Sequence, residues 1–336
     1  MKNLNYIISI VIWLLFNHAT HGQNSTFTIA FGSCNDQNKS NPFWTDIIEQ
    51  SPNLWIWGGD NIYADTYNME KMSRMYQQQK SHSQYSKLIK EIPALGIWDD
   101  HDYGLNDGGK EYAKKRESQQ LFLDFLDVPK DSPRREHEGI YHSEIFKTSE
   151  GSIKIILLDT RYFRTALTKA KERNRRYKPN KNEGTILGSE QWKWLENVLN
   201  SSITDFTLIV SSIQILSSEH GFEKWANFPN EVEKLFKLIQ KSKSKNILFL
   251  SGDRHISEFS TLQLDSLNYP LIDFTSSGLT HSYNSYTYEP NKYRKGNVVS
   301  TLSYGLIEFD IKKRKVTFKM MGKDKTVLQE FTQFYP

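Results

Sequence analysis

Four short clusters of metal-binding side chains stand at the ends of apolar stretches, and this arrangement constrains the fold more than any other feature of the chain. The apolar stretches cover residues 27–31, 54–57, 94–97 and 246–250. The clusters that follow them are Gly32-Ser33-Cys34, Gly59-Asp60-Asn61-Ile62-Tyr63, Trp98-Asp99-Asp100-His101-Asp102 and Gly252-Asp253-Arg254-His255. In an open α/β sheet, ligands bind outside the carboxyl ends of the strands. We therefore predict that the four clusters share one site at one edge of a sheet.

Strands and helices alternate through the first half of the chain. Helices predicted over residues 41–50, 69–90 and 110–126 separate the first strands, and this βαβαβ order indicates a largely parallel sheet. Further strands are predicted at 140–146, 153–158 and 206–210, and further helices at 189–199 and 230–243. Beyond Asp253 the pattern becomes rich in strands, at 256–264, 271–274, 304–311 and 316–321. These later strands predict a second sheet packed on the first.

The first 22 residues have the features of an export signal. Lys2 supplies the initial charge, residues 6–16 are apolar but too few to span a bilayer, and Thr20 and Gly22 occupy the −3 and −1 positions of a cleavage site. We expect cleavage after Gly22, one domain over residues 23–336, and a secreted or periplasmic location. The alternative is an uncleaved membrane anchor. No later segment is apolar and long enough to span a membrane.

Composition and charge narrow the range of functions that the chain can have. The net charge of +4 is too small to indicate a nucleic-acid-binding module. A basic segment at residues 164–182 is either a solvated loop or a cationic lip that attracts an anionic substrate. Cys34 is the only cysteine, so an internal disulfide is impossible. It is either a buried inert thiol or a metal ligand, and its place at a strand end favours the ligand.

The residue types in the clusters suggest a pair of cations. The carboxylate of Asp60 has two oxygens and can bridge two cations, as a two-metal hydrolase requires. Tyr63 follows three residues later, and only a strongly acidic cation holds a phenol as phenolate at neutral pH. Together with the Cys34 thiolate, this phenolate favours ferric iron over zinc or magnesium.

The third and fourth clusters add acids and imidazoles. The run from Asp99 to Asp102 crowds negative charge, which is costly unless cations neutralise it or the acids face water or cap a helix. His101 has a pKa range suited to protonating a leaving oxygen. Asp253 and His255 can both reach inward if the backbone turns between them.

The order of these motifs resembles a known family. GSC at 32–34, GDNIYAD at 59–65, WDDHD at 98–102, LDTRYFR at 158–164, SSIQ at 211–214 and SGDRH at 251–255 are similar to the motifs of PhoD-like (alkaline phosphatase D type) metallophosphatases, within the calcineurin-like metallophosphoesterase superfamily. The resemblance implies an α/β fold, a four-layer α/β/β/α sandwich with two facing mixed sheets.

The resemblance also implies roles for single residues. Asp60 would bridge the metals, Cys34 and Tyr63 would bind Fe(III), and Asp100 would bind the second metal. Asp253 and His255 would each bind one metal, and His101 would act as the acid beside the phosphate. Arg161 is the expected phosphate-binding guanidinium, although a surface or packing arginine is an equal alternative.

One departure from the superfamily pattern affects the second metal. The block that should carry a lone histidine holds Gln214, whose role is open. A second metal short of imidazoles would be calcium or another oxygen-seeking divalent ion.

The expected function is hydrolysis of a phosphate mono- or diester outside the cytoplasm, with Asp60, His101 and Arg161 taking part in catalysis. Two alternatives remain at this point. A non-catalytic family member would bind phosphorylated polymers or lipid headgroups, and a glycosidase would use the carboxylates as acid and base. The sequence gives no signal for the oligomeric state.

Overall fold

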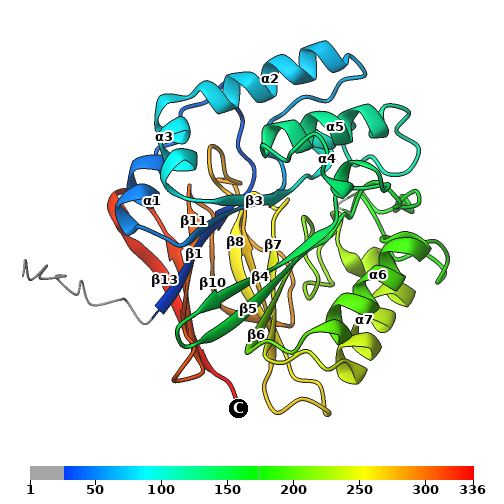
Figure 1. Ribbon diagram of the computed structural model, residues 1–336. Coiled ribbons are helices and arrows are strands. Elements are labelled where there is room, and N and C mark those ends of the chain that lie inside the picture. Colours follow the sequence, from blue (N-terminus) through cyan, green and yellow to red (C-terminus); the bar gives the residue numbers. More distant parts are fainter. Residues whose placement is uncertain (1–25, 174) are drawn as a thin grey trace, which may run out of the picture.

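Two mixed β-sheets pack face to face, and helices cover their outer faces (Figure 1). The structure is a computed structural model that describes residues 26–173 and 175–336. The predicted export signal therefore lies outside the described residues. The four-layer α/β/β/α sandwich expected from the sequence is confirmed.

The first sheet has six strands in the order β13-β12-β11-β1-β2-β3. Its strands β1, β2 and β3 are parallel, and β11 joins the outer side of β1 in antiparallel register. The strands are β1 (Thr26–Gly32), β2 (Leu54–Gly58), β3 (Ala94–Ile97), β11 (Tyr304–Asp310), β12 (Lys315–Met321) and β13 (Val327–Phe334).

The second sheet has seven strands in the order β10-β8-β9-β7-β6-β5-β4. Its centre, from β5 through β6 and β7 to β9, is parallel, and both margins are antiparallel. The strands are β4 (His142–Thr148), β5 (Gly151–Leu157), β6 (Phe206–Val210), β7 (Ile247–Ser251), β8 (Ser257–Leu262), β9 (Leu271–Ser276) and β10 (Arg294–Val299).

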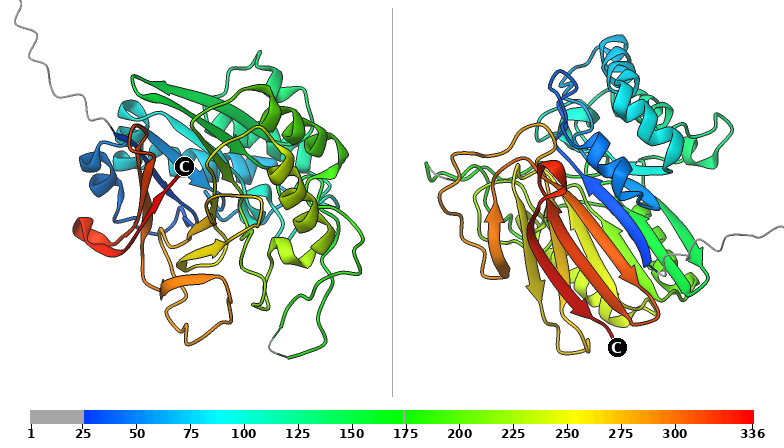
Figure 2. Two further views of the ribbon diagram at one scale, coloured as in Figure 1. Left: turned by 90° about the horizontal axis from the view of Figure 1, so that it is seen from below. Right: turned by 90° about the vertical axis from the view of Figure 1, so that its left-hand side faces the viewer.

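The helices lie on both sides of the pair of sheets, as the two turned views in Figure 2 show. The group α1, α2, α3 and α5 lies beside the first sheet, and α6 and α7 lie beside the second (Figure 1). The α-helices are α1 (Trp44–Gln50), α2 (Met69–Ser81), α3 (Ser83–Glu91), α4 (Asp100–Tyr103), α5 (Lys115–Phe125), α6 (Gly188–Ser201) and α7 (Pro229–Lys241). Short 3-10 helices cover Pro133–Arg135, Trp225–Asn227 and Lys323–Lys325. In the part of the chain that is described, no helix is long and apolar enough to cross a membrane.

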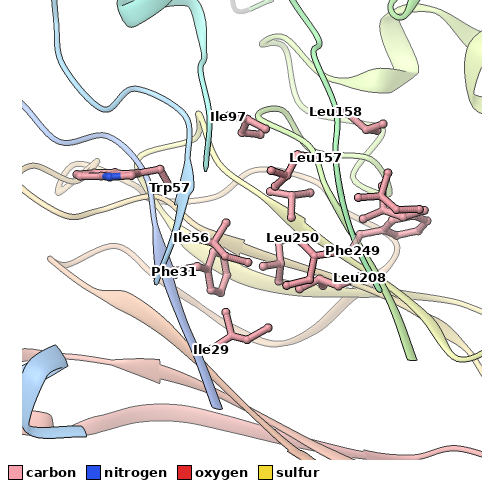
Figure 3. Packing of buried hydrophobic residues seen from close by; sticks show 14 of the residues in the cluster. Ile29, Phe31, Ile56, Trp57, Ile97, Leu157, Leu158, Leu208, Phe249 and Leu250 are labelled. Atoms are coloured by element: carbon pink, nitrogen blue, oxygen red, sulfur yellow. The ribbon is translucent and has the colours of Figure 1, made fainter. Parts of the chain in front are cut away.

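The core lies between the sheets and follows the alternation of side chains along each strand. Inward-facing residues of the two sheets approach one another in Figure 3, where Ile29, Phe31 and Ile56 oppose Leu208 and Leu250. The rings of Phe31 and Phe274 join the sheets edge to face, with centroids 4.9 Å apart.

Alternate residues of β2 point the other way. Trp55 and Trp57 pack against Trp44 of α1 at centroid distances of 5.3 and 5.5 Å. Both faces of this central strand are therefore buried, as expected for the parallel part of a sheet.

The division of the strands between the sheets differs from the sequence prediction. The last three strands, β11 to β13, return to the first sheet beside β1. The first sheet is therefore mixed, as the family resemblance implied, and only the largely parallel sheet indicated by the βαβαβ order was wrong. The second sheet is instead built mainly from the middle of the chain. Either way, β1, β2, β3 and β7 carry the four clusters.

Candidate metal centre

The four clusters meet at one edge of the sandwich. β1, β2 and β3 run parallel, so the turns that follow them lie together at the carboxyl edge of the first sheet. β7 runs parallel to β9, and an isolated parallel bridge between Ser33 and Ser277 continues the first sheet onto the end of β9. Both sheets thus present their carboxyl ends to one site.

Tight turns direct the acids into this site. A Cβ on Gly59 would lie 2.7 Å from the Cβ of Asp99, so only glycine lets the two turns approach. The non-glycine residues Cys34, Asp60, Asp253 and His255 all adopt left-handed backbone conformations, with φ of 60°, 51°, 68° and 54°. Such strain is uncommon and concentrates at functional sites.

The first group of candidate ligands surrounds one carboxylate oxygen. Ligand atoms of Cys34, Asp60 and His255 all lie within 4.8 Å of one another. The sulfur of Cys34 lies 3.4 Å from Oδ2 of Asp60. The hydroxyl of Tyr63 lies 3.1 Å from that same oxygen and 3.3 Å from Nε2 of His255. A thiol, a phenol, an imidazole and a carboxylate therefore converge.

Two further groups overlap this one through shared carboxylates. Asp60, Asp100 and His101 form one, and Asp99, Asp100 and Asp253 form the other, each with ligand atoms within 4.8 Å. Asp60 belongs to the first two groups and Asp100 to the last two. Oδ2 of Asp99 is buried without a hydrogen-bond partner among the described residues. This chain of groups has the connectivity of a site for two cations with Asp60 between them.

Burial and mutual repulsion penalise the negative charges of Asp60, Asp99 and Asp253. At Asp100, burial is outweighed by the charges of Arg161 and His101, which lower the pKa. Burial, with added repulsion from Cys34 and Asp100, raises the pKa of Asp60 well above its ordinary value. Burial raises the pKa of Asp253 in the same way. It also raises the pKa of Asp99 to about 7, against the opposing charge of Arg161. Crowded acids of this kind need a compensating positive charge.

The thiol has the same need. Burial raises the pKa of Cys34 to about 12. Without a cation the group is a neutral thiol at physiological pH. A bound cation would hold it as thiolate, the form that ligates metals.

His101 stands at the opening of the site. Its Nδ1 lies 2.5 Å from Oδ2 of Asp65, and its ring stacks on Tyr63 with centroids 4.2 Å apart. Burial acts to lower the pKa of His101, but the carboxylates of Asp60 and Asp100 outweigh it and raise the pKa to about 11. Asp65, which the sequence reasoning assigned no role, therefore orients this imidazole.

Ser277 was also missed as part of the site. Ser277 lies 3.0 Å from the sulfur of Cys34 and accepts the backbone N–H of His255 at 2.8 Å. It fixes two candidate ligands at once. It lies in the stretch TSSGLTH at 275–281, at the end of β9, and this place after a strand was the available signal.

Asp102 is the acid of the third cluster that serves structure. It accepts the backbone N–H of Asp99 at 2.7 Å and that of Asp60 at 3.2 Å. It also accepts the side chain of Asn61 at 2.5 Å. Asp102 thus ties the turn after β2 to the turn after β3.

Arg161 lies behind the carboxylates rather than in front of them. Its side chain is fully buried, and its Nε donates to Oδ1 of Asp99 at 2.6 Å. Its Nη1 donates to Glu223 at 2.7 Å, and Glu223 also pairs with Arg164. Because these acids occupy the guanidinium, the geometry does not support the direct phosphate contact predicted for Arg161. It favours a role in holding Asp99.

Gln214 lies outside the candidate metal groups. Its Nε2 donates to Glu258 at 2.7 Å and to Thr275 at 2.9 Å, within the second sheet. The described part of segment 164–182 is mixed in character. Arg164 is buried, while Arg176 is exposed and pairs with Asp107 at 2.7 Å.

A cleft of about 450 Å³ opens in front of the metal groups. Its lining combines candidate metal ligands with other charged and aromatic residues. Its lining comprises Asp100, His101, Asn106, Asp107, Arg176, Phe222, Glu223, Asp253, Arg254, His255, Ser282 and Tyr283.

Comparison with protein families shows which family has this arrangement of motifs. The family model of the PhoD-like phosphatases matches residues 29–319, which include all four clusters. The chain belongs to the PhoD-like phosphatase family. The predicted resemblance is confirmed.

Relatives and solved structures of this family and its neighbours agree with the fold. Alkaline phosphatase D of Bacillus subtilis (strain 168) is 23% identical over 248 residues, covering 65% of this chain and 41% of that protein. The chain thus spans about two fifths of that relative's length. The solved structure of PhoD superposes with a TM-score of 0.74 at 17% identity, covering 92% of this chain and 68% of that one. Purple acid phosphatase PPD1 from yellow lupin (Lupinus luteus) superposes with a TM-score of 0.61 at 14% identity, covering 93% and 54%.

Proposed function

We propose that this PhoD-like family member is a metal-dependent phosphoric ester hydrolase. The observation that carries the proposal is the chain of three ligand groups linked by Asp60 and Asp100. The buried Asp99 Oδ2 without a partner and the raised pKa values of the acids fit a site built for cations. A glycosidase would need two carboxylates with separate acid and base roles, whereas these carboxylates are packed together.

The donor types divide the site into two halves. Cys34, Tyr63, His255 and Asp60 would hold Fe(III), because thiolate and phenolate both favour a trivalent ion. Asp60, Asp100 and Asp253 would hold the second ion, with Asp99 beside them, and their oxygen atoms suit calcium or another oxygen-seeking divalent ion. Bound cations would neutralise phosphoryl oxygens and lower the pKa of the attacking water.

The protein's own residues would place the ester and move a proton. Asp65 holds Nδ1 of His101, which leaves Nε2 as the atom that donates to the leaving oxygen. Arg161 acts through Asp99, whose Oδ1 it binds while Oδ2 stays free. It is a positioning residue in this scheme.

Hydrolysis of two model esters tests the proposal. Purified protein should hydrolyse p-nitrophenyl phosphate, bis-p-nitrophenyl phosphate or both, and a chelator should abolish the activity until metal is restored. The variant Asp60→Asn should lose at least about a hundredfold in kcat, since it weakens both halves of the site. The ratio of the two rates assigns the preference for monoesters or diesters. No hydrolysis of either ester at several pH values, with metal restored, would contradict the proposal.

A non-catalytic phosphate-binding protein is the second candidate. The position of Gln214, which bonds within the sheet and supplies no imidazole, favours it. Metal-dependent binding of a phosphorylated polymer without turnover of any ester would support this candidate over the hydrolase.

Export is part of the same proposal. The features of residues 1–22 support a secreted or periplasmic enzyme. N-terminal sequencing of the exported protein should begin at Gln23, and a mature chain that still begins at Met1 would contradict this.

A further inference from the structure

Arg254 stands between two candidate ligands, yet its own side chain faces a different part of the cleft. Its guanidinium lies 4.3 Å from the ring centre of Phe222. Its Nη2 alone pairs with Glu289, at 3.0 Å from Oε1 and 2.7 Å from Oε2. The residue is only 6% exposed, and its Nε has no hydrogen-bond acceptor among the described residues. A buried guanidinium nitrogen without an acceptor is costly unless a ligand supplies one.

The surroundings of Arg254 carry a surplus of positive charge. Burial, with the nearby charges of Arg175 and Arg254, lowers the pKa of Lys224 to about 7. Burial, together with the charges of Arg254, Lys224 and Arg175, also lowers the pKa of the buried His220. Arg254 pairs with the carboxylate of Glu289. The cations crowded around it would attract an anionic ligand.

The acids that line the cleft do not cancel this surplus, because each has its own partner. Asp107 pairs with Arg176 at 2.7 Å and accepts the hydroxyl of Tyr177 at 2.7 Å. Glu223 pairs with Arg161 and Arg164 behind the wall. The remaining lining acids, Asp100 and Asp253, belong to the candidate metal groups.

We propose that Arg254 forms a second anion subsite in the cleft, beside the metal groups, and selects phosphate esters that carry another negatively charged group. This inference rests on the proposed hydrolase function and adds a substrate class to it. The ester's phosphate would lie at the metal groups. The second anionic group would accept from the guanidinium of Arg254, which lines the cleft, with Phe222 against the face of the guanidinium.

Two esters of the same shape test the subsite. The first is 4-(carboxymethyl)phenyl phosphate, and the second is its neutral amide, 4-(carbamoylmethyl)phenyl phosphate. Wild-type protein loaded with metal should show about a tenfold higher kcat/KM for the acid, the range expected for one charge-assisted hydrogen bond. Arg254→Gln should bring the ratio to about one, through a larger loss in kcat/KM for the acid than for the amide. The surface variant Lys312→Gln, which removes an exposed charge, should keep the wild-type ratio.

Two controls separate recognition from damage to the fold. Metal content is measured for each variant, because Arg254 adjoins Asp253 and His255. Glu289→Gln keeps Arg254 and removes its competing carboxylate, so this variant should keep or increase the preference for the acid. The double variant Arg254→Gln with Glu289→Gln should also lack the preference for the acid. This result would exclude repulsion by an unpaired Glu289 as the cause of the loss in Arg254→Gln.

Equal kcat/KM for the two esters in wild type, or an equal loss for both in Arg254→Gln at full metal content, would overturn the subsite. Titration calorimetry with the same two esters measures the preference as a ratio of Kd values, without turnover. Failure of hydrolysis with the Kd preference intact would therefore count against the hydrolase and in favour of the subsite.

Discussion

The phenol of Tyr63 is the residue whose role is easiest to see directly. It lies 3.1 Å from Asp60 and 3.3 Å from His255, inside the proposed iron half of the site. A phenolate on ferric iron absorbs visible light, so concentrated iron-loaded protein should be violet, and Tyr63→Phe should bleach it. Visible absorption spectra of the two proteins at equal iron content make the comparison. A colourless iron-loaded wild type would remove Tyr63 from the ligands.

Substitution of Cys34 tests the iron half of the site through its affinity for iron. Its thiol is fully buried beside Asp60 and Ser277 and, with a pKa raised by burial to about 12, needs a cation to ionise. Cys34→Ser should weaken iron retention by at least about tenfold, the lower range for lost interactions around a metal. Iron remaining after dialysis against a mild chelator measures it. Unchanged retention would make Cys34 an inert core residue.

The identity of the candidate ligands was largely predictable from the sequence, whereas the roles of their neighbours were not. Strand ends placed Cys34, Asp60 and Asp253 at one edge because the chemistry and the position are both local signals. Asp99 is held by Arg161, which lies 62 residues away in the chain. Only the folded structure shows that this arginine occupies one oxygen of Asp99 and is itself withdrawn from the cleft.

Single elements show where local patterns are insufficient. The helix predicted over residues 69–90 is two helices, because His82, with φ −58° and ψ 125°, leaves the helical conformation between them. Strands β10 and β13 were missed. Their exposed residues break the apolar pattern, and pairing with β8 and β12 makes them strands.

The turns after β2 and β3 form a unit held by Asp102. Asp102→Ala would leave the buried N–H groups of Asp99 and Asp60 without their acceptor. We expect a loss of about 3 kcal/mol in the free energy of unfolding, the sum of more than one unsatisfied buried donor. Urea denaturation measures it, with Asp131→Ala at an exposed turn as the control. A loss no larger than that of the control would show that Asp102 does not hold the turns.

Lys224, at the start of the short helix Trp225–Asn227, gives the fold a pH dependence. Burial and the charges of Arg175 and Arg254 lower its folded pKa to about 7, against the attraction of Glu223 and Glu289. Its unfolded pKa is about 10.4. Between these values the unfolded chain binds more protons, so this group makes stability rise with pH from about 7 towards 10.

Comparison with a variant isolates this contribution. Lys224→Met removes the titrating group and keeps the buried stem. Between pH 7 and pH 9.5, wild type should gain about 3 kcal/mol in the free energy of unfolding relative to Lys224→Met. Guanidinium denaturation at the two pH values measures the difference. Parallel changes in both proteins would show that Lys224 is solvated in the folded state.

For the whole molecule, the predicted four layers are confirmed. The predicted assignment of the last strands to the second sheet is wrong, because β11, β12 and β13 belong to the first. Period-two apolar patterns locate strands, but they carry no information on which sheet a strand joins. The contacts that decide it are long-range, such as Phe206 of the second sheet against Phe309 of the first, with ring centroids 5.3 Å apart. The prediction of the site does not depend on which sheet each strand joins, because all four clusters follow strands whose carboxyl ends share one edge.

We propose that two cations share Asp60 between the halves of the site. Elemental analysis of the purified protein, alongside the variant Asp60→Asn, tests it most directly. About two metal ions per chain are expected in the wild type, one of them iron, and both should be lost in the variant, because Asp60 belongs to two of the three ligand groups and is assigned to both halves of the site. A wild type that holds no stoichiometric metal after metal is supplied, or an Asp60→Asn variant that keeps both ions, would contradict it.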